Sequence, residues 1–455
     1  MSQVLSQQIE AAYREKFPTS EKLYQRGVSL FPNGVTHDGR YLQPFPIYAE
    51  RAAGSKKYDV DGGEIIDYWI GHGAMLLGHS HPAVVESVRA QAERMTHPGA
   101  CHELELIWAE WVRKLIPSAE MMRFTNSGTE ATLMALRVAR IASGKQKVIK
   151  FAGHFHGWHD LLTPANGPPN ESGEYSHPGV TDGVAGDLVI VPPNDLDAVA
   201  RAIDEHDPAC LFLEGNGTRW GVVPIRENFL RGIRQLTSEK GVIFILDEVI
   251  TGFRVHPGGF QAHCNVIPDM TTLAKVLAGG LPGGCLAGRA DLMQVLAFEN
   301  PLGKKMKHPG TYNANPLSAA AGSAALEVVS TGQPCQTANE TAGKIRAGLN
   351  ELFQEKGVDW VAYGDFSAIK ILPEYNGPRP EGDDFIPYDN DYRKLDRKFD
   401  PALSHAFRCS LLLGGVDWMG WAGSTSVAHS EADIERTIEA FSGAIDLLRG
   451  DGLIA

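Results

Sequence analysis

The sequence lacks any long hydrophobic run. Among its 455 residues no apolar stretch approaches the roughly 18 residues that a membrane-spanning helix needs. The N-terminus, MSQVLSQQIEAAYREKF, is polar and lacks the apolar core of a secretory signal peptide. The six cysteines are scattered without a CxxC pair, which disfavours a disulfide framework. These absences predict a cytoplasmic protein with no membrane partner.

The chain has fewer basic than acidic residues. The chain has 42 Lys and Arg against 55 Asp and Glu, a formal charge of −13. That balance argues against nucleic acid as a partner, although it leaves room for a local basic pocket. Internal repeats and low-complexity segments are also missing. The hydrophobic content of 43% is that of a globular protein with a sizeable core, and the length predicts roughly two or three domains.

Apolar runs and helical stretches alternate through the middle of the chain. The predicted strands cover 121–125, 147–151, 188–191, 210–214 and 242–248. Strands this apolar, separated by helices, predict a mainly parallel sheet covered on both faces, and so an α/β fold.

The two ends of the chain follow other patterns. Residues 1–30 predict an amphipathic helix, and 46–68 predict a hairpin around DVDGG. Two amphipathic helices, 337–357 and 430–450, flank a polar segment, 374–403, that predicts a long loop. We therefore expect an N-terminal segment over 1–70, a large α/β domain over 71–330 and a small α+β domain over 331–455.

The stretch TTLAKVLAGGLPGG holds one lysine, Lys275, among small and apolar residues. Burying an ammonium without a partner is costly. One interpretation is a surface lysine whose methylene groups lie along apolar surface while its ammonium stays in water. The other is an amine with a lowered pKa that forms a Schiff base with an aldehyde. The stretch alone leaves both open.

An apolar strand, VIFILDE, ends in Asp247 and Glu248. Ligands of open α/β sheets bind outside the carboxyl ends of the strands. An aspartate there often only caps a turn. An aspartate in this position can also be the counter-ion of a protonated heterocycle nitrogen, which pyridoxal phosphate requires. The chain between Asp247 and Lys275 is long enough for a strand and loops to return to the same pocket.

Two stretches are candidates for holding an anion. RFTNSGTEATLMALRVAR reads as a strand, a small polar turn and a helix, so the backbone N–H groups after Ser127 can bind an anion. The same residues also fit an ordinary capped helix. In HPGTYNANP, Gly310 and Thr311 offer a second N–H group and hydroxyl.

Five motifs together resemble one family. TNSGTEA, HGWHD, LDEVITGFR, AKVLAGGLPGG and GTYNANPLSAAAG occur in the order found in class III pyridoxal-phosphate aminotransferases, and the chain is most similar to the glutamate-1-semialdehyde aminomutase-like branch. The likeness runs from about residue 30 to about 445. It implies a fold-type I pyridoxal-phosphate transferase and a homodimer whose active sites are shared.

The resemblance implies cofactor roles for particular residues. Lys275 matches the Schiff-base lysine and Asp247 the partner of the pyridine nitrogen. The matches to the phosphate site are Ser127, Gly128, Thr129, Gly310 and Thr311, with Thr311 reaching in from the neighbouring subunit.

Further matches surround the cofactor ring. Val249 matches the residue packed on one ring face. Phe155, with His156 after it, takes the place of the family's usual stacked tyrosine. Glu214 matches the start of the family's EP motif near the cofactor oxygen, although the proline is missing here.

The predicted substrate residues are Arg40, Trp69, His72 and Trp421. Arg40 aligns with the arginine that binds the substrate carboxylate in the aminomutase, whereas Trp421 replaces its glutamate and His72 a tryptophan. Four tryptophans are expected to line an aromatic pocket: Trp69, Trp220, Trp418 and Trp421. These departures favour a bulky or aromatic, carboxylate-bearing amine, of the β-amino acid or arylglycine type.

The predicted activity is a ping-pong transamination from this amine to a keto acid, with Lys275 as general base and acid. A glutamate-1-semialdehyde-type aminomutase or a racemase on the same cofactor is the alternative. A metal-dependent hydrolase is a remote one, suggested by the HFHGWHD residues His154, His156, His159 and Asp160. No metal is expected. A non-catalytic binding protein is disfavoured, because Lys275 and Asp247 are of no use to packing alone.

Overall fold

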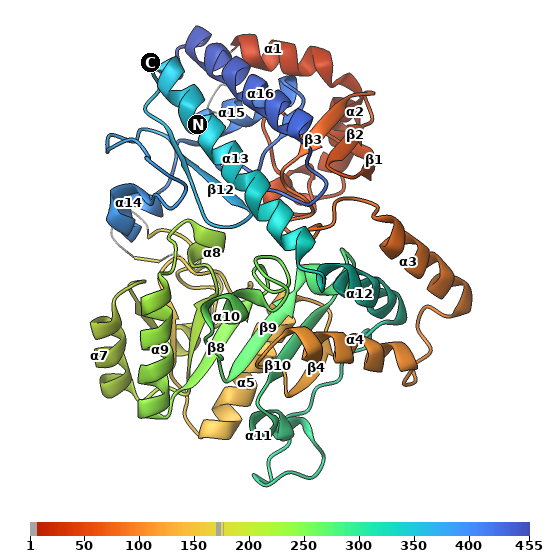
Figure 1. Cartoon of the computed structure of the whole chain (residues 1–455), viewed down its shortest axis with the longest axis vertical. Helices are drawn as coiled ribbons and strands as arrows, with labels where there is room; N and C mark the ends of the chain where they lie inside the picture. Colours follow the sequence, from red (N-terminus) through yellow and green to blue (C-terminus); the bar gives the residue numbers. More distant parts are fainter. Residues whose placement is uncertain (1–6, 170–173, 176) are drawn as a thin grey trace.

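The computed structural model describes residues 7–169, 174–175 and 177–455. Figure 1 shows two lobes, one built around a large sheet and the other carrying both ends of the chain. The predicted N-terminal helix is two helices, α1 (Gln7–Lys16) and α2 (Pro18–Val28). The chain breaks between them because Pro18 has no N–H to continue a helix and is favoured where one starts. Residues 1–6 of that prediction lie outside the described residues.

The large lobe is built on a seven-stranded sheet with the order β4-β10-β9-β8-β7-β5-β6. Its strands are β4 (Met121–Thr125), β5 (Val148–Phe151), β6 (Leu188–Val191), β7 (Cys210–Glu214), β8 (Ile243–Glu248), β9 (Met270–Ala274) and β10 (Gly284–Gly288). From β9 to β6 all neighbours are parallel, and β10 is antiparallel to both β9 and β4. The predicted mainly parallel sheet is therefore confirmed.

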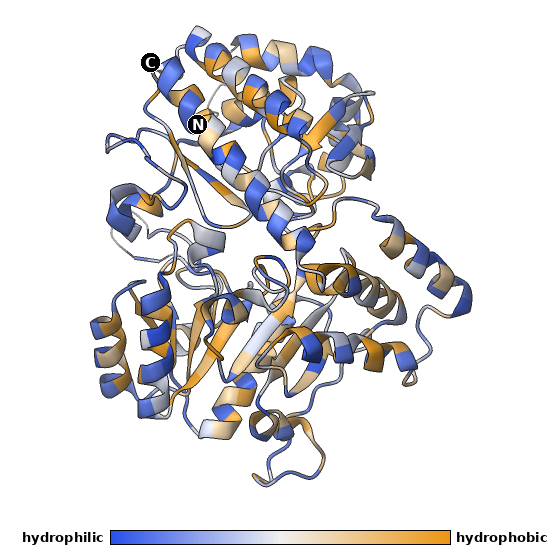
Figure 2. Cartoon of the chain, in the orientation of Figure 1, coloured by the Kyte–Doolittle hydropathy of each residue, from blue (hydrophilic) through white to orange (hydrophobic). Residues whose placement is uncertain are grey.

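Helices cover both faces of this sheet. α5 (Gly128–Ser143) packs on β9 and β10, and α7 (Leu196–His206) and α9 (Glu227–Lys240) cover the other face. Alternate residues serve the two cores: Phe212 lies in the cluster with α5, whereas Leu211 and Leu213 lie in the cluster with α7 and α9. Figure 2 shows the resulting apolar strands between helices with polar outer faces.

The second lobe joins the two ends of the chain. Its sheets are β1-β2-β3-β13 and β11-β12-β14, and β3 pairs in parallel with β13. The strands are β1 (Ala49–Ala53), β2 (Lys56–Asp59), β3 (Glu64–Asp67), β11 (Val361–Tyr363), β12 (Ala368–Leu372), β13 (Val416–Asp417) and β14 (Ala422–Ser424). One core cluster contains Tyr13 from α1 together with Trp418 after β13. The domain boundaries near residues 70 and 330 stay a prediction.

The long helices of this lobe are α13 (Gln333–Lys356), α15 (Pro401–Leu413) and α16 (Glu431–Gly450). The predicted loop over 374–403 contains the 3-10 helix η5 (Pro387–Asn390), α14 (Tyr392–Leu395) and the start of α15. The other helices are α3 (Pro82–Arg94), α4 (Glu103–Leu115), α6 (Asp182–Ala185), α8 (Thr218–Gly221), α10 (Gly259–Cys264), α11 (Ala290–Met293) and α12 (Pro316–Val329). The other 3-10 helices are η1 (Pro32–Gly34), η2 (Asp38–Arg40), η3 (Lys275–Ala278) and η4 (Gln294–Leu296). No helix in the described part of the chain is long and apolar enough to cross a bilayer.

Candidate active site

Three neighbouring parallel strands bring the key side chains together at their carboxyl ends. Glu214 ends β7 and lies in register with Asp247 of β8, while Lys275 follows directly after β9. All three line one cavity of about 130 Å³. The predicted residues that the structure gathers around it are Gly128, Thr129, Phe155, His156, Glu214, Asp247, Val249 and Lys275. The sequence analysis predicted a ligand site at this edge of the sheet, outside the carboxyl ends of the strands.

Lys275 lies at the point where β9 turns into η3. Its backbone is left-handed, with φ of 54°, which is strained for a side chain that has a Cβ and points to a functional constraint. Burial lowers the pKa of the Lys275 amine, Arg254 adds to that effect, and Asp247 and Glu214 oppose it. The amine is therefore easier to deprotonate than that of a surface lysine.

Asp247 is held by two donors. Its Oδ1 accepts the backbone N–H of Val249 at 3.0 Å, and its Oδ2 lies 2.7 Å from Nδ1 of His156. Both side chains are buried. Burial lowers the pKa of His156, while Asp247 opposes that shift. A neutral His156 that donates from Nδ1 fixes the carboxylate and leaves it lone pairs for a further N–H donor.

Glu214 accepts three backbone N–H groups. Its Oε1 lies 2.6 Å from the nitrogen of Phe155 and 2.9 Å from that of Arg219, and Oε2 lies 3.4 Å from that of Trp220. Burial still raises the pKa of Glu214 to about 7. The carboxyl group of Glu214 therefore changes its charge near neutral pH. Its hydrogen bonds also connect the loop after β7 to the loop that carries Phe155.

The start of α5 forms the opposite wall. Ser127 is the N-cap, and its hydroxyl accepts the N–H of Glu130 at 3.2 Å, so the N–H groups of Gly128 and Thr129 have no acceptor within the helix. A Cβ at Gly128 would stand 2.8 Å from Cγ2 of Val249, so only glycine allows this close approach. The result is a helix N-terminus open to an anion.

A second cavity, of about 450 Å³, contains three of the predicted substrate residues, Arg40, Trp69 and His72. The Arg40 side chain is exposed and donates to Oγ1 of Thr36 at 2.9 Å. His72 stacks on His37 with ring centroids 4.4 Å apart, and burial lowers its pKa to about 4. The turn that carries His72 ends at Gly73, where a Cβ would lie 3.9 Å from Cδ of Lys275. The second cavity is therefore adjacent to the first.

Other predicted residues lie elsewhere. Trp421 packs in the core of the second lobe, stacked on Phe407 at 4.5 Å, with its Nε1 donating to Ser404. Trp418 lies in the same core, so the four tryptophans do not line one pocket. Gly310 is partly buried and Thr311 is exposed, and neither lines either cavity.

The histidine-rich motif forms no metal site among the described residues. His154 Nδ1 accepts the N–H of Glu214 at 3.0 Å, and His156 is bound to Asp247. The one group in the described part of the chain that could hold a metal is Glu227, His263 and Cys264, far along the sequence from this motif. The histidines therefore support the cavity wall.

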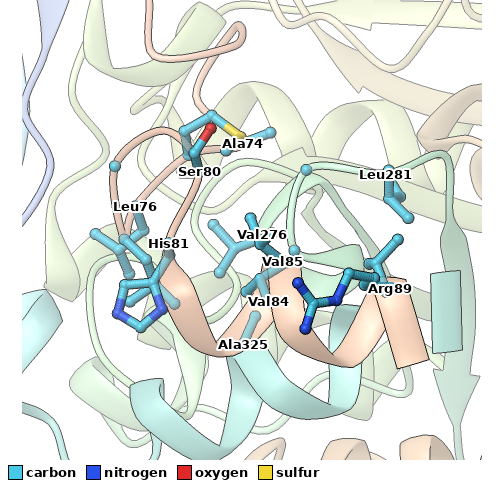
Figure 3. A pocket seen from close by; sticks show the side chains of 16 residues that line it. Ala74, Leu76, Ser80, His81, Val84, Val85, Arg89, Val276, Leu281 and Ala325 are labelled. Carbon is cyan, nitrogen blue, oxygen red and sulfur yellow. The ribbon is translucent and has the colours of Figure 1, made fainter. Parts of the chain in front are cut away.

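Some lining residues were missed by the sequence prediction. Asn216 is one of them, and its buried amide has no partner among the described residues. Trp220 was expected in the substrate pocket but lines the smaller cavity, where its Nε1 has no partner among the described residues. The motif EGNGTRWG could have predicted them, because its glycines directly follow a strand end, where ligands bind in this kind of sheet. A separate apolar cavity of about 480 Å³ between α3 and Gly280 carries none of the predicted residues (Figure 3).

The smaller cavity fits pyridoxal phosphate, the predicted cofactor. The helix start suits its anionic group, the Asp247 carboxylate its protonated ring nitrogen, and the Lys275 amine its aldehyde. Several buried polar atoms of its lining residues have no partner among the described residues: His156 Nε2, Asn216 Nδ2 and Oδ1, and Trp220 Nε1. A polar ligand gives such atoms partners that the chain lacks.

Comparisons with known proteins identify the family of the chain. Residues 39–376 match the family described as Aminotransferase class-III. A glutamate-1-semialdehyde 2,1-aminomutase of Methanopyrus kandleri is 35% identical over 441 residues, which is 96% of this chain and 100% of that one. An omega-transaminase of Sphaerobacter thermophilus has a similar structure, with a TM-score of 0.86 and 30% identity over 96% of this chain and 100% of that one. A solved transaminase with PLP bound has a TM-score of 0.84 and 28% identity over 96% of this chain and 99% of that one.

These findings confirm the predicted fold type and cofactor and correct the predicted activity. Other relatives that share the aminomutase name are 34–42% identical to this chain. The prediction of transfer from a bulky or aromatic amine to a separate keto acid is therefore wrong, and the aminomutase alternative agrees better with the relatives. The prediction of a bulky substrate depended partly on Trp421 as a residue of the substrate pocket. That side chain instead packs in the core of the second lobe and does not face the site.

Proposed function

Because the chain belongs to the class III aminotransferase family, whose members use pyridoxal phosphate, we propose that it is an aminomutase of the glutamate-1-semialdehyde type. Such an enzyme moves an amino group between neighbouring carbons of one small carboxylate-bearing molecule. The observation that carries the proposal is the identity of 34–42% to proteins of that name.

Lys275 is the residue that moves protons in this proposal. Bound pyridoxal phosphate supplies an aldehyde that condenses with amines and a ring that withdraws electrons. The Lys275 amine, with its pKa lowered by burial, takes a proton from one substrate carbon and returns it to another position.

Asp247 and the α5 start hold the cofactor. Asp247, fixed by the 2.7 Å contact with His156, keeps a proton on the ring nitrogen. The N–H groups of Gly128 and Thr129 and the Ser127 hydroxyl bind the phosphate. Val249 and Phe155 pack on the ring, and Glu214 keeps the Phe155 loop in place through the N–H of Phe155.

Arg40 binds the substrate carboxylate from the second cavity. Its guanidinium has one hydrogen-bond partner within the described part of the chain, the Thr36 hydroxyl, so most of its donors are free for a carboxylate. Trp69 and His72 are the neighbouring walls. Because burial keeps His72 neutral, it adds no second charge at neutral pH.

A homodimer completes the proposed site. Gly310 and Thr311 stand on an exposed segment away from their own cavities, which fits a role at the phosphate of a second copy. The proposal thus keeps the predicted shared active sites.

The test is conversion of glutamate-1-semialdehyde by the purified enzyme in buffer without any keto acid. The expected result is many turnovers per site to the isomer whose amino group is on the neighbouring carbon. Product that stops at about one equivalent per site until a keto acid is added would contradict the aminomutase assignment.

Two variants separate the roles in that assay. Lys275→Ala should abolish turnover, and borohydride treatment should link the cofactor to Lys275 in the wild-type protein only. Arg40→Ala should raise KM by about tenfold or more, the cost of a charged hydrogen bond, with a smaller change in kcat. An unchanged KM would remove Arg40 from the carboxylate site.

A further inference from the structure

Arg254 is a buried cation beside the site that no predicted role uses. It follows β8, and its side chain is fully buried. Its guanidinium donates to the Gly73 carbonyl from Nε at 3.1 Å and Nη2 at 2.6 Å, and from Nη1 to the Thr425 carbonyl at 3.0 Å and the Ser367 hydroxyl at 3.3 Å. All these partners are neutral, and no carboxylate of the described residues pairs with it. A buried charge without a counter-ion is costly, so it needs a reason.

The contacts of Arg254 converge on the wall that faces Lys275. The turn that it holds has left-handed backbone at Ile70, Gly71, His72 and Gly73, so it needs outside support to keep this conformation. At Gly73 a Cβ would lie 3.9 Å from Cδ of Lys275 and 3.5 Å from the Trp220 ring. The guanidinium lies over the same Trp220 ring, 5.1 Å from its centroid. Arg254 thus fixes two surfaces that border the lysine stem.

The charge of Arg254 also acts on the amine. The groups that face Lys275 are Asp247 from β8, Glu214 from β7, His72 from the turn and Arg254. Asp247 and the ionised form of Glu214 favour a protonated Lys275, whereas Arg254 opposes it. His72 is neutral at neutral pH because burial lowers its pKa. Arg254 is therefore the permanent cation in this set.

We propose that Arg254 is a positioning residue for Lys275, holding the Gly73 turn against the lysine stem and supplying a buried positive charge that disfavours a second cation at the amine. The inference rests on the proposed role of Lys275 as the reactive amine, and it does not depend on which substrate is converted.

The direct test measures the reactivity of the Lys275 amine in the full-length, cofactor-free chain. Competitive labelling with acetic anhydride over a range of pH, read at the Lys275 peptide by mass spectrometry, reports the unprotonated fraction. In Arg254→Met the labelling near neutral pH should fall by about threefold to tenfold, because loss of the neighbouring charge favours the ammonium. In the holoenzyme, the pH titration of the yellow absorption band should move to higher pH.

A second variant separates charge from geometry. Arg254→Lys keeps the charge and loses the fork to Gly73, so labelling should stay within about twofold of wild type while kcat falls by about tenfold with little change in KM. If Arg254→Met does not fold, Arg254→Gln, which keeps amide donors for the Gly73 carbonyl, takes its place.

Arg346→Met is the matched control. Arg346 is equally buried but lies in the second lobe, bound to Asp383 and two backbone carbonyls. It should lose stability and leave Lys275 labelling unchanged. Unchanged labelling in a folded Arg254→Met protein, or equal losses in both variants, would overturn the proposal. Failure of borohydride to attach the cofactor to Lys275 in the wild type would instead contradict the proposed function.

Discussion

At residue 214 the chain buries a carboxyl group beside that of Asp247. Glu214 lies in register with Asp247, which follows from the parallel pairing of β7 and β8. Three backbone N–H groups satisfy its oxygens, but burial still raises its pKa to about 7. A carboxyl that binds its proton more tightly in the folded than in the unfolded chain stabilises the fold at low pH and loses that contribution as pH rises.

Glu214 should therefore make stability fall with pH. Its contribution is fully present below the ordinary pKa of 4.5 and is lost as pH rises through about 7, a change of about 3 kcal/mol. Glu214→Gln removes the titration and keeps an oxygen for the N–H donors. Melting temperatures of the cofactor-free protein between pH 5 and pH 8 should fall less in this variant than in wild type. Glu86→Gln, at an exposed site, should behave as wild type, and parallel curves for all three proteins would contradict the assignment.

Among the single elements, helix α5 carries the proposed phosphate site at its start. Strand β4 and helix α5 are joined by a polar turn, and the sheet places that turn against Val249 after β8. The sequence motif predicted an anion site or an ordinary cap. The structure favours the anion site, because Gly128 and Thr129 at the start of the helix line the cavity.

Gly128→Ala tests this close approach. The added Cβ would lie 2.8 Å and 2.9 Å from the two Val249 methyl groups, so the wall must shift. Overpacking of this kind costs about 1–3 kcal/mol, which predicts about fivefold to a hundredfold weaker cofactor binding in fluorescence titrations. The control is Gly443→Ala in α16, where a Cβ meets no atom within 4 Å, and there affinity should not change. Equal affinities for both variants would show that the α5 start does not border the cofactor.

At the scale of the whole molecule, the second lobe exists only because the two ends of the chain meet. Strand β3 from the N-terminal part pairs with β13 from the C-terminal part, and α1 packs on α15. Trp418 lies between Tyr68 and Phe441, with ring centroids 4.7 Å and 5.0 Å away. It therefore connects sequence from both ends in one core.

Trp418→Ala should destabilise the whole molecule. Removing a fully buried tryptophan costs about 3–5 kcal/mol, since it leaves a cavity between the two ends of the chain. Limited proteolysis should then cut the N-terminal segment and the C-terminal helices together, at a higher rate than in wild type. Leu30→Ala, at an exposed position, is the control and should be cut at the wild-type rate. Faster cutting at one end alone would contradict a shared core.

Five of the seven strands of the large sheet and the centre of the site could be predicted from the sequence, whereas β9 and β10 were not predicted. Apolar strands can be predicted because their burial depends on local composition, and Lys275, Asp247 and the Ser127 turn follow strand ends, which a parallel sheet brings to one edge. Only the tertiary structure decided the rest. The β3–β13 pair, the core position of Trp421 and the Arg254 contacts with Gly73 join residues far apart in the chain. Such contacts depend on how completed elements pack, and no local pattern of residues specifies that packing.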